Sequence, residues 1–381
     1  MEHITVLFFD QGASLRLPGF SASCQTSIFP VWGTYTFLDI AMVNTASEIF
    51  GKKLIFARKE KAKTVSAHLQ LWEAADLPIF PADISVEQFS AILNEAGSDH
   101  FLFYDVSQVF LLNPDELVRA AVEAGKDTVK ISLNDIPLDM YIITKKKLKS
   151  GIQHMTKIGA GKKPLFEFLF FEVLADAFEI LLPLQGEAVL LNNIADFYHN
   201  NMRVLSRNFN GILNRLLYAV PQAGGTDTLI SKNGWVRNSF ISPGGRVDGY
   251  VENSVIFSNV HIKEKSSVIN SIIMNGNQVG RNSTIINAIV FPFMEDTQAL
   301  NTNTIGDHVT IGFSGSKANN RDFPDQIREG LTVIGLNPSI PDNCVVEPGC
   351  FIDADVSPAR IKSIKLLKKG NSLLRESGDL Q

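Results

Sequence analysis

The sequence predicts an α/β chain in two parts, a Rossmann-like domain followed by a left-handed parallel β-helix. Three observations predict this fold. Strand-like and helix-like segments alternate over residues 1–215, and aliphatic residues recur at intervals of six over residues 236–356. The length of 381 residues is also more than one ordinary domain needs.

The period of six is the strongest pattern in the chain. Helices repeat about every 3.6 residues and half-buried strands every 2, so neither produces it. A triangular β-helix coil has three sides of about six residues, each with an aliphatic side chain inside, and turn formers such as Gly244 and Pro348 suit its corners. A sandwich with accidental spacing is the alternative. Four runs carry the step: Ile256, Ile262 and Val268; Ile273, Val279, Ile285 and Phe291; Ile305 and Ile311; Ile334, Ile340, Val346 and Ile352.

The first 215 residues alternate between two kinds of segment, which favours a parallel sheet wrapped by helices. Ligands of such sheets bind at the carboxyl ends of the strands, so the loop after Phe9 and the acid Asp105 are where we expect a site. Strands are predicted at residues 6–9, 53–57, 100–104, 128–133 and 140–144, and helices at residues 37–50, 84–96 and 113–124.

Composition excludes several classes of protein. A formal charge of −5 gives no attraction to nucleic acid or to an anionic membrane. Cys24, Cys344 and Cys350 lack metal-ligand spacing, and the last two, six residues apart, are expected inside the β-helix. Residues 4–9 are too short for a signal peptide, and acids interrupt residues 164–184, which predicts an amphipathic helix and no membrane span. We therefore expect a cytoplasmic protein.

Local phrases give a more specific resemblance. Residues 31–44, 134–138 and 194–202 match phrases of the ADP-glucose pyrophosphorylases (glucose-1-phosphate adenylyltransferases) in length and hydrophobic pattern. Residues 236–245 and 251–257 resemble the first coils of the β-helix in that family. The resemblance implies a nucleotidyltransferase domain ahead of the β-helix.

The family joins a nucleoside triphosphate to a sugar 1-phosphate and releases pyrophosphate. The chemistry requires a glycine-rich loop, a basic residue and Mg²⁺, since two anionic phosphates must meet. The family's loop glycines correspond here to Gln11, Gly12 and Ser14, and its arginine to Arg16. Its lysine position holds Thr26, which carries no charge. Side chains at the two altered glycine positions crowd the approach of phosphate to backbone.

The metal ligands are also incomplete. Asp105 matches one of the family's two metal-binding aspartates and is the candidate Mg²⁺ ligand, but the second falls at Leu190. Glu187 replaces it only under a different alignment, and one carboxylate with waters binds Mg²⁺ weakly. The family's sugar-contacting Glu-Lys-Pro motif is absent from the sequence. Thr34 and Thr36 stand where the family has basic residues near its effector site.

Other features have structural and functional interpretations. Asp39 is expected to cap or support the helix that follows Thr36. The lysine cluster of residues 145–149 is interpreted as a solvated loop. His261 and His308 are expected to pack on the surface, although hexapeptide acyltransferases use a histidine as general base. Residues 357–375 are predicted to form a basic amphipathic helix that caps the β-helix.

We thus expect an α/β domain at 1–215, a linker at 216–235, a β-helix at 236–356 and a capping helix with tail at 357–381. The resemblance implies a catalytically impaired regulatory subunit of glycogen synthesis, assembled with a catalytic homologue or itself as a dimer or tetramer. An active Mg²⁺-dependent adenylyltransferase and a scaffold that binds a nucleotide or sugar phosphate are the alternatives. Neither nucleic acid nor a membrane is an expected partner.

Overall fold

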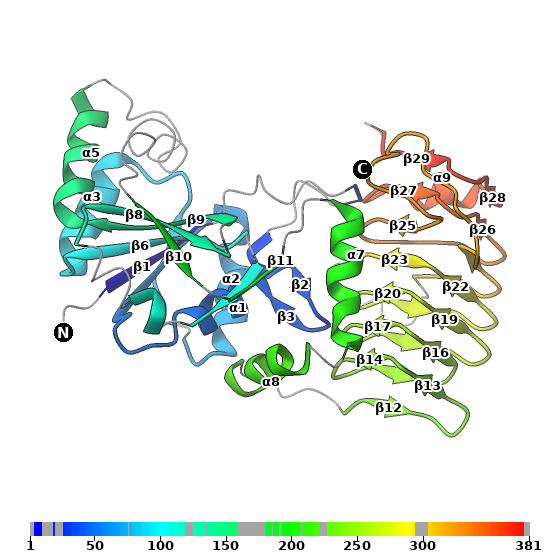
Figure 1. Ribbon diagram of the computed structural model, residues 1–381. Coiled ribbons are helices and arrows are strands. Elements are labelled where there is room, and N and C mark those ends of the chain that lie inside the picture. The colour runs from blue at the N-terminus through cyan, green and yellow to red at the C-terminus, as the bar shows by residue number, and fades with distance from the viewer. Residues whose placement is uncertain are drawn as a thin grey trace.

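The chain folds into an α/β part and a stack of coiled strands that lie side by side (Figure 1). The computed structural model describes residues 4–9, 18–19, 26–74, 76–107, 109–113, 115–118, 125–134, 136–157, 180–184, 186–189, 193–206, 209–220, 227–293 and 304–376. No helix within those residues is long and apolar enough to cross a membrane.

A seven-stranded sheet forms the centre of the α/β part, in the order β10-β8-β9-β6-β1-β4-β5. β1 pairs in parallel with β4 and β6, whereas β9 runs antiparallel to β6 and β8. The predicted α/β domain is therefore confirmed, with one reversed strand. The strands are β1 (Ile4–Phe9), β4 (Lys52–Ala57), β5 (Ile79–Pro81), β6 (His100–Asp105), β8 (Thr128–Leu133), β9 (Ile136–Thr144) and β10 (Ile180–Leu184).

Alternate side chains of β1 fill the cores on the two faces of this sheet. Leu7 and Phe9 pack in a cluster with residues of α3 and α5, and Val6 and Phe8 pack in another with residues of α1 and α2. Both clusters are built mainly of aliphatic and aromatic side chains, as is usual for a sheet that is covered on each face. The helices are α1 (Phe37–Asn44), α2 (Ala62–Gln70), α3 (Val86–Ala96), α5 (Lys145–Lys157), α7 (Ile194–Met202) and α8 (Asn210–Ala219).

Two helix predictions in this part need correction. α1 ends at Asn44, where residues 37–50 were expected to be helical, because Thr45 leaves the helical conformation and its hydroxyl bonds back to the Ala41 carbonyl. Residues 180–184 form strand β10, which pairs with β8, and so are not part of an amphipathic helix. The remainder of that predicted helix, residues 164–179, lies outside the described residues.

The C-terminal part is a parallel β-helix with three sheets, which we name the short, open and covered sheets. Every strand pair in them is parallel, as predicted. The short sheet holds β12 (Leu229–Ile230), β15 (Arg246–Val247), β18 (His261–Ile262) and β21 (Gln278–Val279). The open sheet holds β13 (Trp235–Arg237), β16 (Tyr250–Glu252), β19 (Ser267–Ile269), β22 (Thr284–Ile286), β24 (Thr310–Ile311), β26 (Val345–Val346) and β28 (Leu366–Leu367). The covered sheet holds β14 (Phe240–Ile241), β17 (Val255–Ile256), β20 (Ile272–Ile273), β23 (Ala288–Val290), β25 (Thr332–Ile334), β27 (Phe351–Ile352) and β29 (Ser372–Leu373).

The period of six identifies the inward side chains with one exception. Ile285 lies in the β-helix core, but the core residue of the next strand that pairs with Ile273 is Val290, five positions on. Phe291 instead packs outside the prism, with the α/β part. Cys344 and Cys350 are buried in the β-helix core, as expected.

The coils extend beyond both predicted ends of the β-helix. β12 already pairs with β15, within the stretch expected to be linker. The predicted tail helix is wrong, because α9 spans only Pro358–Lys362 and is followed by β28 and β29. Ile361, Leu367 and Leu373 lie in the β-helix core and continue the six-residue step. The last strands thus add a further coil.

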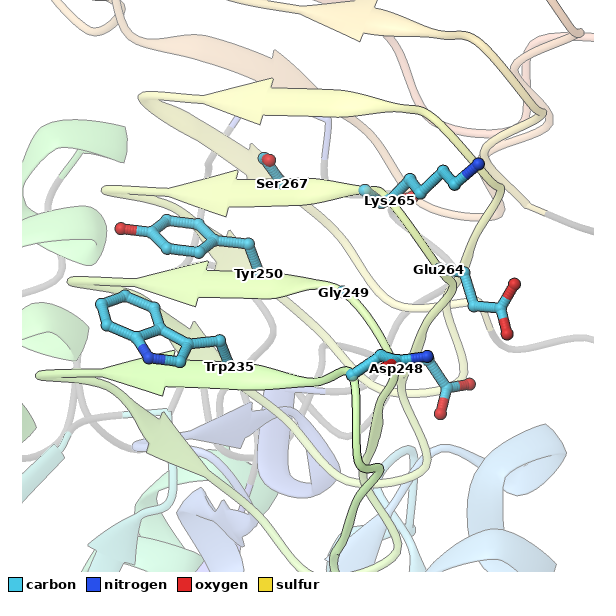
Figure 2. A pocket seen from close by; sticks show the side chains of 9 residues that line it. Trp235, Asp248, Gly249, Tyr250, Glu264, Lys265 and Ser267 are labelled. Atoms are coloured by element: carbon cyan, nitrogen blue, oxygen red, sulfur yellow. The ribbon is translucent and has the colours of Figure 1, made fainter.

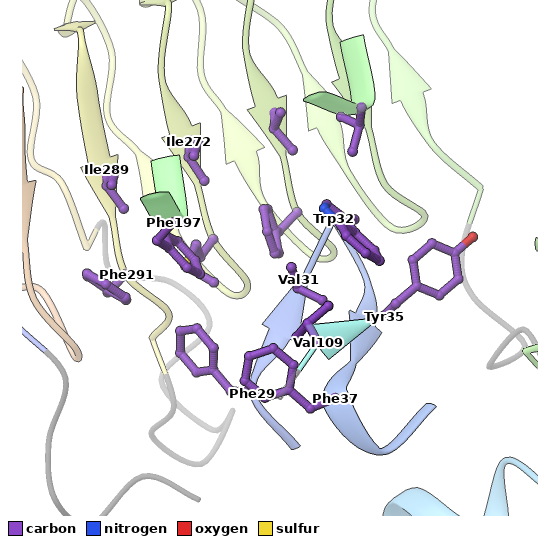
Figure 3. Packing of buried hydrophobic residues seen from close by; sticks show 14 of the residues in the cluster. Phe29, Val31, Trp32, Tyr35, Phe37, Val109, Phe197, Ile272, Ile289 and Phe291 are labelled. Carbon is purple, nitrogen blue, oxygen red and sulfur yellow. The ribbon is translucent and has the colours of Figure 1, made fainter. Parts of the chain in front are cut away.

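One apolar cluster joins the two parts (Figure 3). The rings of Phe29, Phe197 and Phe291 lie within 5.7–6.0 Å of one another, centroid to centroid. Ile272 and Ile289, on the outer face of the covered sheet, belong to the same cluster. The covered sheet is therefore buried on both faces.

Candidate functional site

Asp105 lies at the predicted place, the carboxyl end of β6. It pairs in register with Phe9, the last residue of β1, so it lies beside the start of the expected phosphate loop. Its side chain is 3% exposed, and its Oδ1 accepts a hydrogen bond of 2.8 Å from the N–H of Ser107. A backbone donor therefore already occupies part of the accepting capacity of one carboxylate oxygen.

The remaining predicted site residues are less completely placed. Gln11, Gly12, Ser14 and Arg16 lie outside the described residues. Thr26 begins the 3₁₀ turn Thr26–Ile28, which adjoins α1. Among the predicted site residues that the structure describes, Asp105 is therefore the one whose side chain is placed at the edge of the sheet.

The second metal position is not filled by a described side chain. Leu190 lies outside the described residues. The backbone of Glu187, in β11 (Gly186–Val189), pairs with Leu111 in β7 (Val109–Leu112). Within the residues described, no group of three or more His, Cys, Asp or Glu side chains could hold a metal ion.

A buried polar group lies directly behind Asp105. The amide of Asn44 donates 2.8 Å hydrogen bonds to the Tyr104 hydroxyl and the Phe110 carbonyl, and its oxygen accepts from the Leu112 N–H at 3.2 Å. Burial raises the pKa of Tyr104, and the charge of Asp105 raises it further. This hydroxyl therefore stays protonated at physiological pH and holds α1 against β6.

The segment after β1 contacts the β-helix at Gly19. The N–H of Leu336 donates to the carbonyl of Gly19 at 3.1 Å. Gly19 has φ +82°, and a Cβ there would lie 3.0 Å from the Cα of Gly335. Two glycines thus allow the backbones to meet, and one point of the expected phosphate loop is anchored to the covered sheet.

The hairpin of β2 (Pro30–Val31) and β3 (Tyr35–Thr36) also has structural contacts where the resemblance suggested an effector site. The hydroxyl of Ser258 donates to that of Thr34 at 3.0 Å. Gly33, at φ +94°, leaves no room for a Cβ, which would overlap Ser242 and Phe240 of the β-helix. The hairpin tip therefore docks on the first coils.

Thr36 and Asp39 form a capping box at the start of α1. Asp39 also accepts 2.7 Å hydrogen bonds from the ring nitrogens of His68 and Trp72. Burial alone would raise the pKa of Asp39, but these bonds, the His68 charge and the Thr36 backbone lower it below its ordinary value. The structural role expected for Asp39 is confirmed, and Thr36 takes part in it.

A hollow of about 390 Å³ lies on the β-helix at its first coils (Figure 2). Trp235 stacks on Tyr250 with ring centroids 4.7 Å apart, Arg237 lies over the indole, and Arg237 and the Tyr250 hydroxyl both contact Glu252. The rings, the charges and the hydroxyl of these four residues thus interact with one another across β13 and β16. Sequence reasoning missed this group.

The two histidines weighed as candidate bases occupy surface positions. His261 Nε2 lies 2.7 Å from Asp248 Oδ2, which also accepts from Arg246 at 2.9 Å. His308 has φ +58°, a left-handed corner conformation. Both arrangements agree with the packing role that was expected.

A family model described as GlmU-like, C-terminal hexapeptide matches residues 226–334. The match falls on the three sheets of the β-helix. This part of the chain is a hexapeptide-repeat β-helix. The match supports a nucleotidyltransferase-like hexapeptide-repeat protein and does not reach the α/β part. The chain matches no curated protein.

Proposed function

We propose that this chain is an impaired member of the ADP-glucose pyrophosphorylase family that acts as a regulatory subunit beside a catalytic homologue in glycogen synthesis. The observation that carries the proposal is the make-up of the candidate site. Asp105 is buried and bonded to the Ser107 N–H, and Thr26 occupies the position of a lysine. Transfer of a nucleotidyl group from a triphosphate to the phosphate oxygen of a sugar, with release of pyrophosphate, brings two anions together and needs more cationic support than these residues give.

The contacts of the hairpin and loop support the same proposal. Thr34, Thr36 and Gly19 bond within the protein, to Ser258, Asp39 and Leu336 respectively. In the family that the sequence resembles, the corresponding segments contact effectors and the nucleotide. Here Thr34 and Gly19 fix the α/β part to the β-helix, and Thr36 caps α1. These contacts suit a subunit whose role is to hold and modulate a partner.

The test is an assay of the purified chain with ATP, glucose 1-phosphate and Mg²⁺, alone and mixed with a catalytic homologue from the same organism. We expect no ADP-glucose from the chain alone and altered kcat or KM for the homologue in the mixture. Formation of ADP-glucose by the chain alone, abolished by Asp105→Asn, would show an active adenylyltransferase. Inactivity without any effect on the homologue would favour a scaffold that binds a nucleotide or sugar phosphate.

A further inference from the structure

The first two strands of the open sheet expose a flat aromatic surface. The rings of Trp235 and Tyr250 are stacked, with centroids 4.7 Å apart and an angle of 10° between their planes. β13 is the first strand of its sheet, so no further strand of that sheet lies beyond the indole, and Trp235 is 47% exposed. Trp32 is fully buried and Trp72 is partly buried, so Trp235 is the tryptophan that is open to a ligand.

Contacts among neighbouring residues hold the two rings in place. Arg237 lies over the indole, 5.5 Å from the ring centroid, and pairs with Glu252. The same carboxylate accepts the hydrogen bond of the Tyr250 hydroxyl, and the backbones of Trp235 and Tyr250 pair in register. Because the rings are fixed before a ligand arrives, little side-chain freedom is lost on binding.

The hollow beside the rings is bordered by polar groups that are free to bond to a ligand. Its volume of about 390 Å³ falls within the range of about 300–1,000 Å³ that is usual for small-molecule sites. Asn233, Glu264 and Lys265 are exposed at its edge, and their side chains make no hydrogen bond or ion pair with another described residue. Figure 2 shows the rings to one side and Glu264 and Lys265 to the other. The hollow thus combines an apolar wall with hydrogen-bond donors and acceptors.

The charges around the hollow disfavour an anionic ligand. The lining holds two carboxylates, Asp248 and Glu264, and one ammonium group, that of Lys265. Asp248 Oδ2 accepts a hydrogen bond from Arg246 and lies 2.7 Å from His261 Nε2, so this carboxylate already has partners. A phosphate in the hollow would meet the charge of Glu264 as well as that of Lys265, whereas an uncharged polar ligand meets no net repulsion.

From this arrangement we propose that the hollow at the first coils binds an uncharged carbohydrate chain. A pyranose ring has an apolar C–H face, which packs on an aromatic ring, and a rim of hydroxyls. The C–H face of one sugar packs on the exposed part of Trp235, and its hydroxyls bond to the side chains of Asn233, Glu264 and Lys265. Ser267, which also lines the hollow, meets the next sugar of the chain. The proposal does not depend on nucleotide chemistry or on a catalytic partner.

The first test is titration of the full chain with maltoheptaose and, separately, with cellohexaose. We expect at least one of them to bind with a Kd on the order of 0.1–1 mM and to shield tryptophan fluorescence from quenching by acrylamide. Trp235→Ala should weaken this binding at least about tenfold, measured by saturation-transfer NMR of the sugar. Phe313→Ala is the matched control: it removes a ring that is 62% exposed on the same β-helix, beside another hollow, and should leave the Kd unchanged. Thermal unfolding checks that both variants remain folded.

A second variant separates loss of binding from loss of folding. Glu264→Ala removes an exposed side chain that has no partner among the described residues, so we expect unchanged thermal unfolding and a Kd about threefold higher or more. Because the ligand is uncharged, raising NaCl from about 0.05 to about 0.5 M should not change the Kd of the full chain.

Three results would overturn the proposal. The first is failure of both oligosaccharides to bind at about 10 mM. The second is affinity that is unchanged in Trp235→Ala and Glu264→Ala, or lost equally in Phe313→Ala. The third is binding of ATP that shields Trp235 and weakens with salt while neither oligosaccharide binds, which would assign the hollow to a nucleotide.

Discussion

The covered and open sheets of one β-helix differ in their outward residues, and this difference accompanies a difference in packing. In the covered sheet, Val255, Ile272, Ile289 and Val333 form an apolar row that packs against the α/β part. The corresponding row of the open sheet is centred on Thr284 and stays partly exposed. The inward residues are aliphatic in both, so the coil itself does not distinguish them. The outward positions do.

The largest predicted loss of stability comes from a substitution at the centre of the covered face. Phe291→Ala removes a fully buried ring that packs on Phe29 and Phe197, and should lower the free energy of unfolding by about 3–5 kcal/mol. Thr284→Ala, on the open face, should change it by less than about 0.5 kcal/mol. Denaturant titration of both variants measures the difference. Equal effects would mean that the two faces are not distinguished by packing.

Gly33 tests the docking of the hairpin on the covered face. Gly33→Ala should cost about 2–3 kcal/mol, because the left-handed backbone and the contacts with Ser242 and Phe240 both oppose a Cβ. Gly97→Ala is the control: it has φ +76° with open space around it, so only about 1 kcal/mol of backbone strain is expected. If both substitutions cost the same in chemical denaturation, the hairpin tip is not pressed against the coils.

Asp39 tests the support beneath the same hairpin through pH. Asp39→Asn should cost about 1.5–3 kcal/mol at pH 7, since the ionised carboxylate accepts bonds from His68 and Trp72. Its folded pKa is lowered, so this stability is complete above the unfolded pKa of about 3.9 and is lost as the pH falls through the folded value. Unfolding measured at a series of pH values should show a shallower acid limb for the variant. A parallel limb would assign the acid dependence to other groups.

The smallest expected loss of stability comes from a substitution of Trp235, in the first strand of the open sheet. Trp235→Ala should cost about 1 kcal/mol, because the ring is half exposed and loses chiefly its stacking on Tyr250. The change is best measured by hydrogen exchange of the first coil, which should open more readily than later coils. Uniform opening of the whole β-helix would show that the aromatic pair supports more than its own coil.

The sequence predicted the inward residues well and the outward ones poorly. Six-residue spacing marks inward positions directly, as at Ile334, Ile340 and Val346. The same step at Leu367 and Leu373 was missed because the surrounding lysines suggested a helix. What covers an outward position depends on distant chain segments, so neither the Phe29–Phe291 contact nor the Trp235–Tyr250 stack could be predicted.

The candidate site was partly predictable for a similar reason. Asp105 follows an apolar strand, and the rules for parallel sheets place such a residue at the ligand edge. Its bond to the Ser107 N–H and the meeting of Gly19 with Gly335 depend on local backbone conformation and on packing between the two parts. The spacing of residues along the sequence predicts neither the Asp105–Ser107 bond nor the contact between Gly19 and Gly335.

Titration of the full chain with ATP and Mg²⁺ in a calorimeter tests the central claim of an impaired nucleotide site most directly. The uncharged Thr26 and the partly engaged Asp105 predict no heat of binding at micromolar protein, with or without the metal. Saturable micromolar binding that requires Mg²⁺ and disappears in Asp105→Asn would contradict it.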